Sequence, residues 1–274
     1  MKFTVLALDF DGTIARDGRA HPEVVTAIRD ARAEGITVVL VTGRILSDLL
    51  LVLSEENLFD AIVAENGAVL AFPNGWTRLL GRPASRELLS ELRELRVEVA
   101  FGECVIEADA AAAPQILEAI RKLALPLMLV FNHSRVMVLP QGITKASGLR
   151  EALNMMRLSL HNCIGIGDGE NDHSLLDACE VGVAVSWGCQ SLQKIADHVL
   201  EGSGPGSLAR YIREVSSHPK LPPQRADDRR VLLGETDDGP VVTSMLGRNI
   251  LIAGDPRSGK SWIAGLFTEH LLSQ

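Results

Sequence analysis

Short apolar runs alternate with amphipathic segments along the first part of the chain. Three runs are nearly continuous in apolar side chains, which is typical of strands buried on both faces of a sheet: 3–8, 36–41 and 61–64. The segments between them have the spacing of amphipathic helices, at 22–34 and 47–54. This β-α-β-α-β order predicts a parallel sheet with helices on both faces.

The same alternation returns further along the chain. It predicts a helix at 144–157, a strand at 162–166, a helix at 171–178, a strand at 181–185 and a final helix at 207–215. We therefore expect an α/β core with a Rossmann-like parallel sheet, built from residues 1–73 and 141–215.

The stretch 74–140 has a different order. It predicts a helix at 85–95, strands at 97–101 and 104–108, a helix at 114–123, and strands at 127–131 and 136–139. Turns at 101–103 and 132–134 indicate hairpins, which do not belong in a right-handed β-α-β succession. A small antiparallel sheet with two helices on one face, inserted as a lid, therefore fits better than a continuation of the main sheet.

Composition narrows the functional classes. The chain has 274 residues and a net charge of -8, and it lacks a basic run that could follow a phosphate backbone, so we expect no nucleic-acid partner. No apolar run approaches the roughly 18 residues that span a bilayer, so we expect no transmembrane helix and no membrane partner. Asp9 and Asp11 stand where a signal peptide would need its small-residue cleavage site, so we do not expect export. The four cysteines share no metal-type spacing, which favours free thiols in a cytoplasmic protein.

Acidic residues stand directly after the predicted parallel strands. Asp9 and Asp11 follow the first strand, and Asp168 and Asp172 follow the strand at 162–166. Ligands bind outside the carboxyl ends of such strands, so we expect these four carboxylates to meet. Their mutual repulsion favours a bound divalent cation, and oxygen ligands without His or Cys suit Mg²⁺ better than Zn²⁺.

Each of these segments alone also fits a structural role, because Asp-Gly pairs form turns and the 167–169 loop can cap the next helix. Their joint placement at successive strand ends is what favours a functional site. Lys145 adds to the argument because the chain has only six lysines, and a lysine supplies a compact cation where arginine does not fit.

Four ordered motifs resemble those of the haloacid dehalogenase (HAD) superfamily. They are residues 9–13 (DFDGT), 42–44 (TGR), Lys145 and 167–172 (GDGEND), and the match covers about residues 1–215. Residues 64–68 (AENGA) and the insertion at 74–140 resemble the Cof-like type IIB branch, whose inserted domain is a C2 cap. The short cap is similar to that of archaeal-type phosphoglycolate phosphatases.

The resemblance implies a Mg²⁺-dependent hydrolase of a small phosphorylated metabolite, of the phosphoglycolate or sugar-phosphate type. Asp9 would attack phosphorus and form an aspartyl-phosphate, and Asp11 would act first as acid and then as base. Thr42 and Lys145 would stabilise the transferring phosphoryl group. An acid at position 11 also disfavours dehalogenation, because the true dehalogenases of the superfamily lack it.

The same resemblance implies a metal site and a set of supporting residues. Mg²⁺ would bind a carboxylate oxygen of Asp9, the main-chain carbonyl of Asp11, and Asp168, while Asp172 would ligate the ion or orient a water. The supporting residues would be Gly12, Gly43, Arg44, Asn66 and Asn171.

The C-terminal part carries a second motif. Residues 254–261 (GDPRSGKS) fit the phosphate-loop pattern G-x-x-x-x-G-K-[ST], between a predicted strand at 249–253 and a predicted helix at 261–272. In this interpretation, four residues of the motif would bind the phosphates of ATP: Gly254, Gly259, Lys260 and Ser261. The segment 230–274 resembles the incomplete start of a P-loop ATPase domain, with a leading hairpin at 231–233 and 241–243, and the proline-rich stretch 216–229 is the expected linker.

Three alternatives stay open at this point. The tail motif predicts a nucleotide-binding or ATPase-related module, whereas a phosphotransferase or mutase would use the same aspartyl-phosphate with an alcohol as acceptor. For the tail itself, we favour an amphipathic stripe that docks on the core or on another subunit and so makes an oligomer. This stripe is formed by Trp262, Ile263, Leu266, Phe267 and His270.

Overall fold

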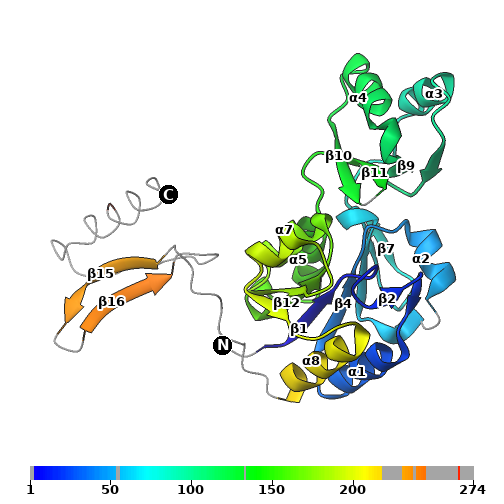
Figure 1. The fold of residues 1–274 in the computed structure, drawn as a ribbon. Coiled ribbons are helices and arrows are strands. Elements are labelled where there is room, and N and C mark those ends of the chain that lie inside the picture. The colour runs from blue at the N-terminus through cyan, green and yellow to red at the C-terminus, as the bar shows by residue number, and fades with distance from the viewer. Residues whose placement is uncertain are drawn as a thin grey trace. The chain divides into compact units, whose positions relative to one another are not determined.

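The computed structural model describes residues 3–53, 56–132, 134–217, 230–236, 239–244 and 265. Its main sheet has eight strands (Figure 1), in the order β14 (His198–Leu200), β13 (Val181–Val185), β12 (Cys163–Gly167), β1 (Val5–Leu8), β4 (Thr37–Val41), β5 (Ala61–Ala64), β6 (Val69–Ala71) and β7 (Thr77–Leu79). The six strands from β14 to β5 are parallel, which confirms the predicted sheet.

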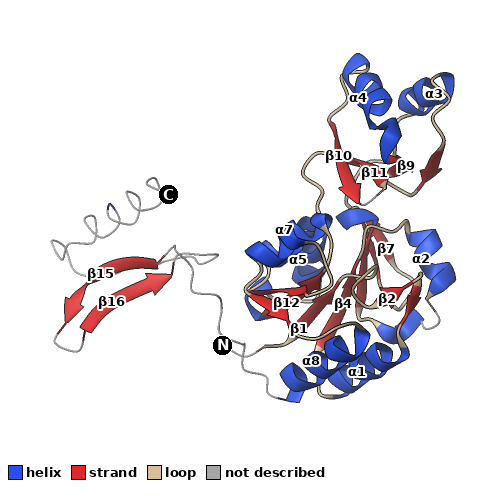
Figure 2. Cartoon of the chain, viewed as in Figure 1, coloured by secondary structure: helices blue, strands red, loops and turns tan. Residues whose placement is uncertain are grey.

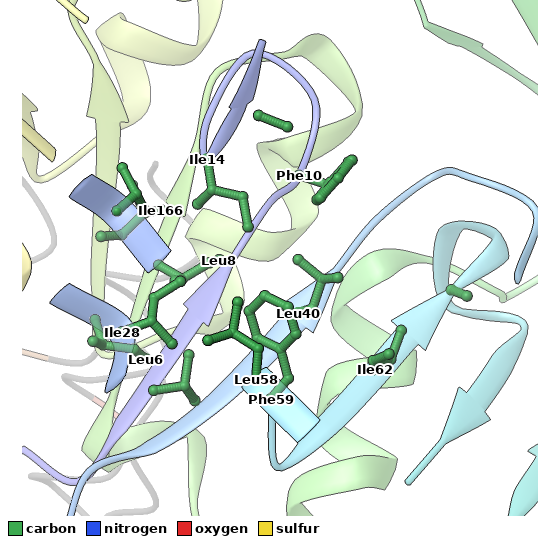
Figure 3. Packing of buried hydrophobic residues seen from close by; sticks show 14 of the residues in the cluster. Leu6, Leu8, Phe10, Ile14, Ile28, Leu40, Leu58, Phe59, Ile62 and Ile166 are labelled. Atoms are coloured by element: carbon green, nitrogen blue, oxygen red, sulfur yellow. The ribbon is translucent and has the colours of Figure 1, made fainter. Parts of the chain in front are cut away.

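Helices cover both faces of this sheet (Figure 2). Successive side chains of its central strands point to opposite faces, and those on both faces are apolar. Leu6 and Leu8 of β1 pack in the cluster shown in Figure 3, under α1 (Pro22–Ala33), α2 (Leu46–Val52) and α8 (Pro205–Ser217). Val5 and Ala7 pack in a second cluster, under α5 (Lys145–Met155), α6 (His173–Ala178) and α7 (Gln190–Ile195).

A second sheet is formed between β7 and α5. Its four antiparallel strands have the order β10 (Leu127–Asn132), β11 (Arg135–Pro140), β9 (Ile106–Asp109) and β8 (Val99–Phe101). Val136 and Val138 face a cluster that includes α3 (Arg86–Glu94) and α4 (Ala113–Lys122), whereas Met137 and Leu139 belong to a core cluster of the main sheet. The small sheet therefore lies between its own helices and the core, with both helices on one face as predicted.

Several short elements were not predicted. The main sheet gains an antiparallel hairpin, β6 and β7, and an edge strand, β14, each of only three residues, which is too short to show a period of two. A two-stranded ribbon and five 3₁₀ turns complete the first part of the chain: β2 (Ala15–Arg16), β3 (Arg19–Ala20), η1 (Glu56–Leu58), η2 (Glu65–Gly67), η3 (Ala110–Ala112), η4 (Leu160–Asn162) and η5 (Glu170–Asp172).

Three predicted boundaries need correction. The helix expected at 171–178 is the 3₁₀ turn η5 followed by α6, and α8 runs to Ser217, past the expected end at residue 215. Strand β9 begins at Ile106 and not at Cys104. The reason is that the main-chain N–H groups of Cys104 and Val105 bind the side chain of Glu65 and so are not available to a strand.

The chain divides into two compact units, Met1–Pro223 and Gln224–Gln274. The second contains an antiparallel hairpin of β15 (Arg230–Thr236) and β16 (Gly239–Ser244), which confirms the predicted leading hairpin. The phosphate-loop motif at 254–261 lies outside the described residues, as do the strand predicted before it and the side chains of the amphipathic stripe. Within the described part of the chain, no helix is both long and apolar enough to cross a membrane.

Candidate active site

The topology brings the ends of two strands together. Strands β1 and β12 are parallel neighbours, and Leu8 pairs with Ile166. Asp9 continues this ladder, because its N–H donates to the carbonyl of Ile166 at 2.9 Å. The chain leaves β1 toward β4 on one side and returns through β12 on the other, so the residues after these two strands lie at the topological switch point of the sheet.

Three carboxylates gather at this point. Asp9, Asp168 and Asp172 each offer an oxygen within 4.8 Å of the others. Their exposed fractions are 4%, 9% and 0%, so the group is buried. The carboxylate of Asp11 is not a member, because it turns to Arg44 instead. Three of the four acids expected to meet thus do so by their side chains.

Lys145 stands between two of these acids. Its ammonium donates to Oδ1 of Asp9 and to Oδ1 of Asp172, both at 2.6 Å, and the side chain is 1% exposed. Thr144 caps the helix α5 at whose first position Lys145 stands, and its side chain accepts the N–H of Ser147. The cap fixes where the helix begins and hence where the ammonium is held.

The charges of this group act on one another. Burial raises the pKa of Asp9 well above its ordinary value, the charges of Asp172 and Asp168 raise it further, and Lys145 lowers it. Burial lowers the pKa of Lys145, but the carboxylates of Asp172 and Asp9 outweigh this effect and raise that pKa above its ordinary value. Lys145 therefore favours its ammonium form, and its single charge offsets only one of the three neighbouring acids when they are ionised.

The loop after β12 is shaped around the side chain of Asp172. Oδ2 of Asp172 accepts hydrogen bonds from the main-chain N–H groups of Asp168 and Gly169 at 3.1 and 2.9 Å.

The loop after β1 contacts the side chain of Asp168. Thr13 donates a hydrogen bond from its hydroxyl to Asp168 at 3.2 Å, a contact that the sequence did not reveal. Gly12 has a φ of +77°, and a Cβ built there would overlap the carboxylate of Asp168. Glycine at this position is therefore required on two counts.

The residues after β4 form the neighbouring wall. Thr42 is fully buried, and its hydroxyl oxygen accepts the N–H of Arg44 at 3.1 Å, which leaves the hydroxyl proton free to act as a donor. The guanidinium of Arg44 binds both oxygens of Asp11 at 2.7 Å and lies 5.0 Å above the ring of Phe10. Hydrogen bonding to Asp11 raises the pKa of Arg44. Arg44 thus orients Asp11.

The structure places the other predicted supporting residues on neighbouring loops. A Cβ built at Gly43 would lie 3.4 Å from Nδ2 of Asn171, in η5, and 3.5 Å from Sδ of Met137, in β11. Asn66 is 3% exposed, and its N–H donates to the carbonyl of Thr42 at 3.0 Å. Of the five supporting residues predicted from the sequence, Gly12 meets Asp168 directly, whereas the other four lie beside the neighbouring loops; Met137 brings the second sheet next to Gly43.

The donor set fits a hard divalent cation. With all three acids ionised, the group and its one ammonium leave two negative charges in a buried place, and no His or Cys accompanies the acids in this group. The raised pKa of Asp9 supports the same conclusion. Burial and the neighbouring carboxylates disfavour its ionised form, and a bound cation would offset both effects. Mg²⁺ is the ion that this chemistry suits.

The family follows from comparison with known proteins. The model of the haloacid dehalogenase-like hydrolases matches the chain over residues 6–101 and 84–212. The chain belongs to the haloacid dehalogenase-like hydrolase family. A phosphoglycolate phosphatase of Methanoculleus marisnigri is 30% identical over 217 residues, which cover 73% of this chain and 92% of that protein. A phosphoglycolate phosphatase of Methanothermobacter thermautotrophicus is 28% identical over 76% of this chain and 96% of its own length.

Solved structures of the family share the fold. A phosphatase of this superfamily from Bacteroides thetaiotaomicron superimposes with a TM-score of 0.64 at 22% identity, and it covers 78% of this chain and 95% of its own. A sugar phosphatase of HAD subclass IIB gives a TM-score of 0.63 at 18% identity, over 78% and 98% of the two chains. The resemblance to the HAD superfamily predicted for residues 1–215 is thus confirmed, and the chain is a phosphatase of the HAD family.

Proposed function

We propose that this HAD phosphatase hydrolyses a small phosphomonoester through an aspartyl-phosphate on Asp9, with Mg²⁺ as its cofactor. The observation that carries the proposal is the buried group of Asp9, Asp168 and Asp172 around the ammonium of Lys145. Bound Mg²⁺ would be held by Asp9, the main-chain carbonyl of Asp11, and Asp168, with Asp172 beside it, and would neutralise charge on the phosphoryl oxygens.

Asp9 is the nucleophile in this scheme. Lys145 fixes Oδ1 of Asp9 and opposes the rise in its pKa, and the ionised carboxylate attacks phosphorus as the bond from phosphorus to the leaving oxygen breaks. Thr42 donates a hydrogen bond from its hydroxyl group to a phosphoryl oxygen. Both contacts stabilise negative charge in a place shielded from water, where they are strongest.

Asp11 moves the protons. It gives one to the leaving alcohol oxygen, and then takes one from the water that attacks phosphorus and breaks the bond to Asp9. Arg44 binds both oxygens of Asp11, and each oxygen keeps a second lone pair on which a proton can be carried. Arg44 thereby orients the acid between its two tasks.

The substrate class rests on the relatives and on the insertion. We propose phosphoglycolate or a sugar phosphate, because two relatives that cover most of the chain are phosphoglycolate phosphatases and one structural neighbour is a sugar phosphatase. We further propose that the domain predicted at residues 74–140 acts as a cap on the core of residues 1–73 and 141–215, with the correction that its first strand, β7, belongs to the main sheet of the core. Met137 of the inserted sheet lies close to Gly43, which supports this arrangement.

The test is phosphate release from a panel of phosphorylated metabolites with Mg²⁺. The panel includes phosphoglycolate, several sugar phosphates and ATP. Asp9→Asn should lower release by at least about a thousandfold, since it removes the nucleophile. Asp177→Asn is the matched control, because Asp177 is exposed on α6 and the substitution changes the same charge. Turnover that survives in Asp9→Asn, or no release from any monoester by the wild type, would overturn the proposal.

A further inference from the structure

The turn after β5 carries an unusual backbone. Glu65 and Asn66 are consecutive residues with φ values of +53° and +56°, a region that residues other than glycine rarely adopt. Such strain persists only where the surroundings hold it, and it is concentrated at sites that use it. Both side chains are buried, at 0% and 3% exposed.

The carboxylate of Glu65 crosses to the second sheet. Its Oε1 accepts the N–H of Glu103 at 2.9 Å, and its Oε2 accepts the N–H groups of Cys104 and Val105 at 2.8 and 3.3 Å. No ion pair to Glu65 is recorded within the described part of the chain, so its charge is balanced by these main-chain dipoles. Three consecutive donors of one loop thus converge on one anion.

Two further contacts hold this loop, residues 102–105, in place. A Cβ built at Gly102 would lie 2.5 Å from Oε1 of Glu65, so the loop approaches the acid as closely as glycine allows. Cys104 donates its thiol to the carbonyl of Gly81 at 3.2 Å, and both Cys104 and Val105 pack in a core cluster of the main sheet. The loop is therefore attached through one charged contact and a small apolar one.

The same turn touches the active site from its other side. The N–H groups of Glu65 and Asn66 donate to the carbonyls of Arg44 and Thr42, at 2.9 and 3.0 Å. A Cβ built at Gly67 would overlap the carbonyl of Thr144, which caps the helix of Lys145. One turn of three residues thus joins the inserted sheet to two of the elements that carry the candidate catalytic groups.

We infer that Glu65 is a positioning residue that fixes the loop 102–105 of the second sheet on the core. Through this contact it sets how the second sheet lies over the buried group of Asp9, Asp168 and Asp172. The side chain of Glu65 holds the cap, whereas the main chain of residues 65–67 holds Thr42 and α5. Loss of the side-chain contact should therefore release the cap loop and leave the catalytic groups in place.

Hydrogen exchange tests this inference without any assumption about activity. In Glu65→Gln one acceptor oxygen becomes an NH₂ group, so at least one main-chain N–H of the loop loses its partner. We expect amides of the loop 102–105 to exchange about tenfold faster, which corresponds to one hydrogen bond to a charged acceptor. Glu103→Gln is the control, because it removes the same charge from an exposed side chain of the loop and keeps the main-chain donor.

A second variant approaches the contact from the cap. Gly102→Ala places a methyl group against the carboxylate of Glu65 and should accelerate exchange in the same loop. If Glu65 and Gly102 act through one contact, the double variant should exchange little faster than either single variant. Exchange in Glu65→Gln that equals the wild type, or fully additive effects in the double variant, would overturn the inference.

Kinetics give a readout that general damage to the fold would not produce, and this arm rests on the proposed function. For a phosphomonoester that the cap covers, Glu65→Gln should raise KM about tenfold while kcat changes by less than about threefold. A merely structural role would lower kcat through a smaller active fraction and leave KM unchanged. If the wild type releases no phosphate, the proposed function fails, and hydrogen exchange still decides the role of Glu65.

Discussion

Lys145 donates a 2.6 Å hydrogen bond to Asp9, although 136 positions separate the two residues in the chain. The contact is buried, and it joins the end of the central strand to the first residue of α5. A lone buried carboxylate would be costly, and so would a lone buried ammonium. Each of the two residues therefore depends on the other, and the candidate active site forms only when both parts of the core have come together.

Replacing Lys145 by Met tests this dependence. The variant keeps the volume of the side chain but leaves Asp9 and Asp172 without their ammonium, so kcat should fall by about 10² to 10³, as for loss of one electrostatic contact in an active site. Lys122→Met serves as control, since Lys122 pairs with Glu91 on the exposed side of the second sheet's helices. Phosphate release that is equal in the two variants would contradict the assigned role.

Asp168 is a proposed ligand of Mg²⁺, and its removal should change how the stabilisation by Mg²⁺ depends on pH. Burial and like charges raise the pKa of Asp9, so at low pH the folded protein keeps a proton that a bound cation must displace. Mg²⁺ should therefore raise the melting temperature more at pH 8 than at pH 5. Asp168→Asn should abolish this gain, whereas Asp177→Asn should keep it. Thermal unfolding measured with and without Mg²⁺ checks the prediction, and a gain that is independent of pH would refute it.

Gly12 offers a test of close approach. Gly12→Ala combines a positive φ with an overlap between the new methyl group and the carboxylate of Asp168, so we expect loss of Mg²⁺-dependent activity by about tenfold or more. Gly75→Ala has a nearly equal φ of +79° but meets no atom within 4 Å, and it should cost stability alone. Similar activity in the two variants would show that the overlap is relieved without consequence for the site.

Arg44 and Arg32 form a matched pair of side chains. Both bind a carboxylate through two nitrogens, Arg44 at Asp11 and Arg32 at Asp60. Lysine cannot reproduce this fork, so Arg44→Lys should lower kcat/KM about tenfold, whereas Arg32→Lys should leave kcat/KM unchanged. The measurement is steady-state kinetics on the best substrate of the panel. An equal loss in both variants would indicate an effect on the fold rather than on Asp11.

The sequence predicted the core and most of the site because both follow from local pattern. Continuous apolar runs mark parallel strands, and the residues after such runs, Asp9 and Asp168 among them, must meet at one edge of the sheet. The side-chain direction of Asp11 could not be predicted in this way, because its partner Arg44 lies on another strand end.

Glu65 shows the same limit more clearly. It stands within a recognisable motif, but its three partners lie 38 to 40 positions further along the chain and offer only main-chain N–H groups. Main-chain donors leave no trace in residue types, so no pattern indicates the contact. Thr13 is a milder case, since it is part of the first motif and only the folded loop shows that it binds Asp168.

The central claim is that Asp9 carries the phosphoryl group, and reductive trapping tests it most directly. The enzyme is mixed with Mg²⁺ and its best phosphomonoester, quenched during turnover and treated with borohydride, which reduces an acyl phosphate to an alcohol. Peptide mass spectrometry should then find homoserine at position 9, only when substrate is present and not in Asp9→Asn. Continued turnover with an unmodified Asp9, or a reduced residue at another position, would contradict the account.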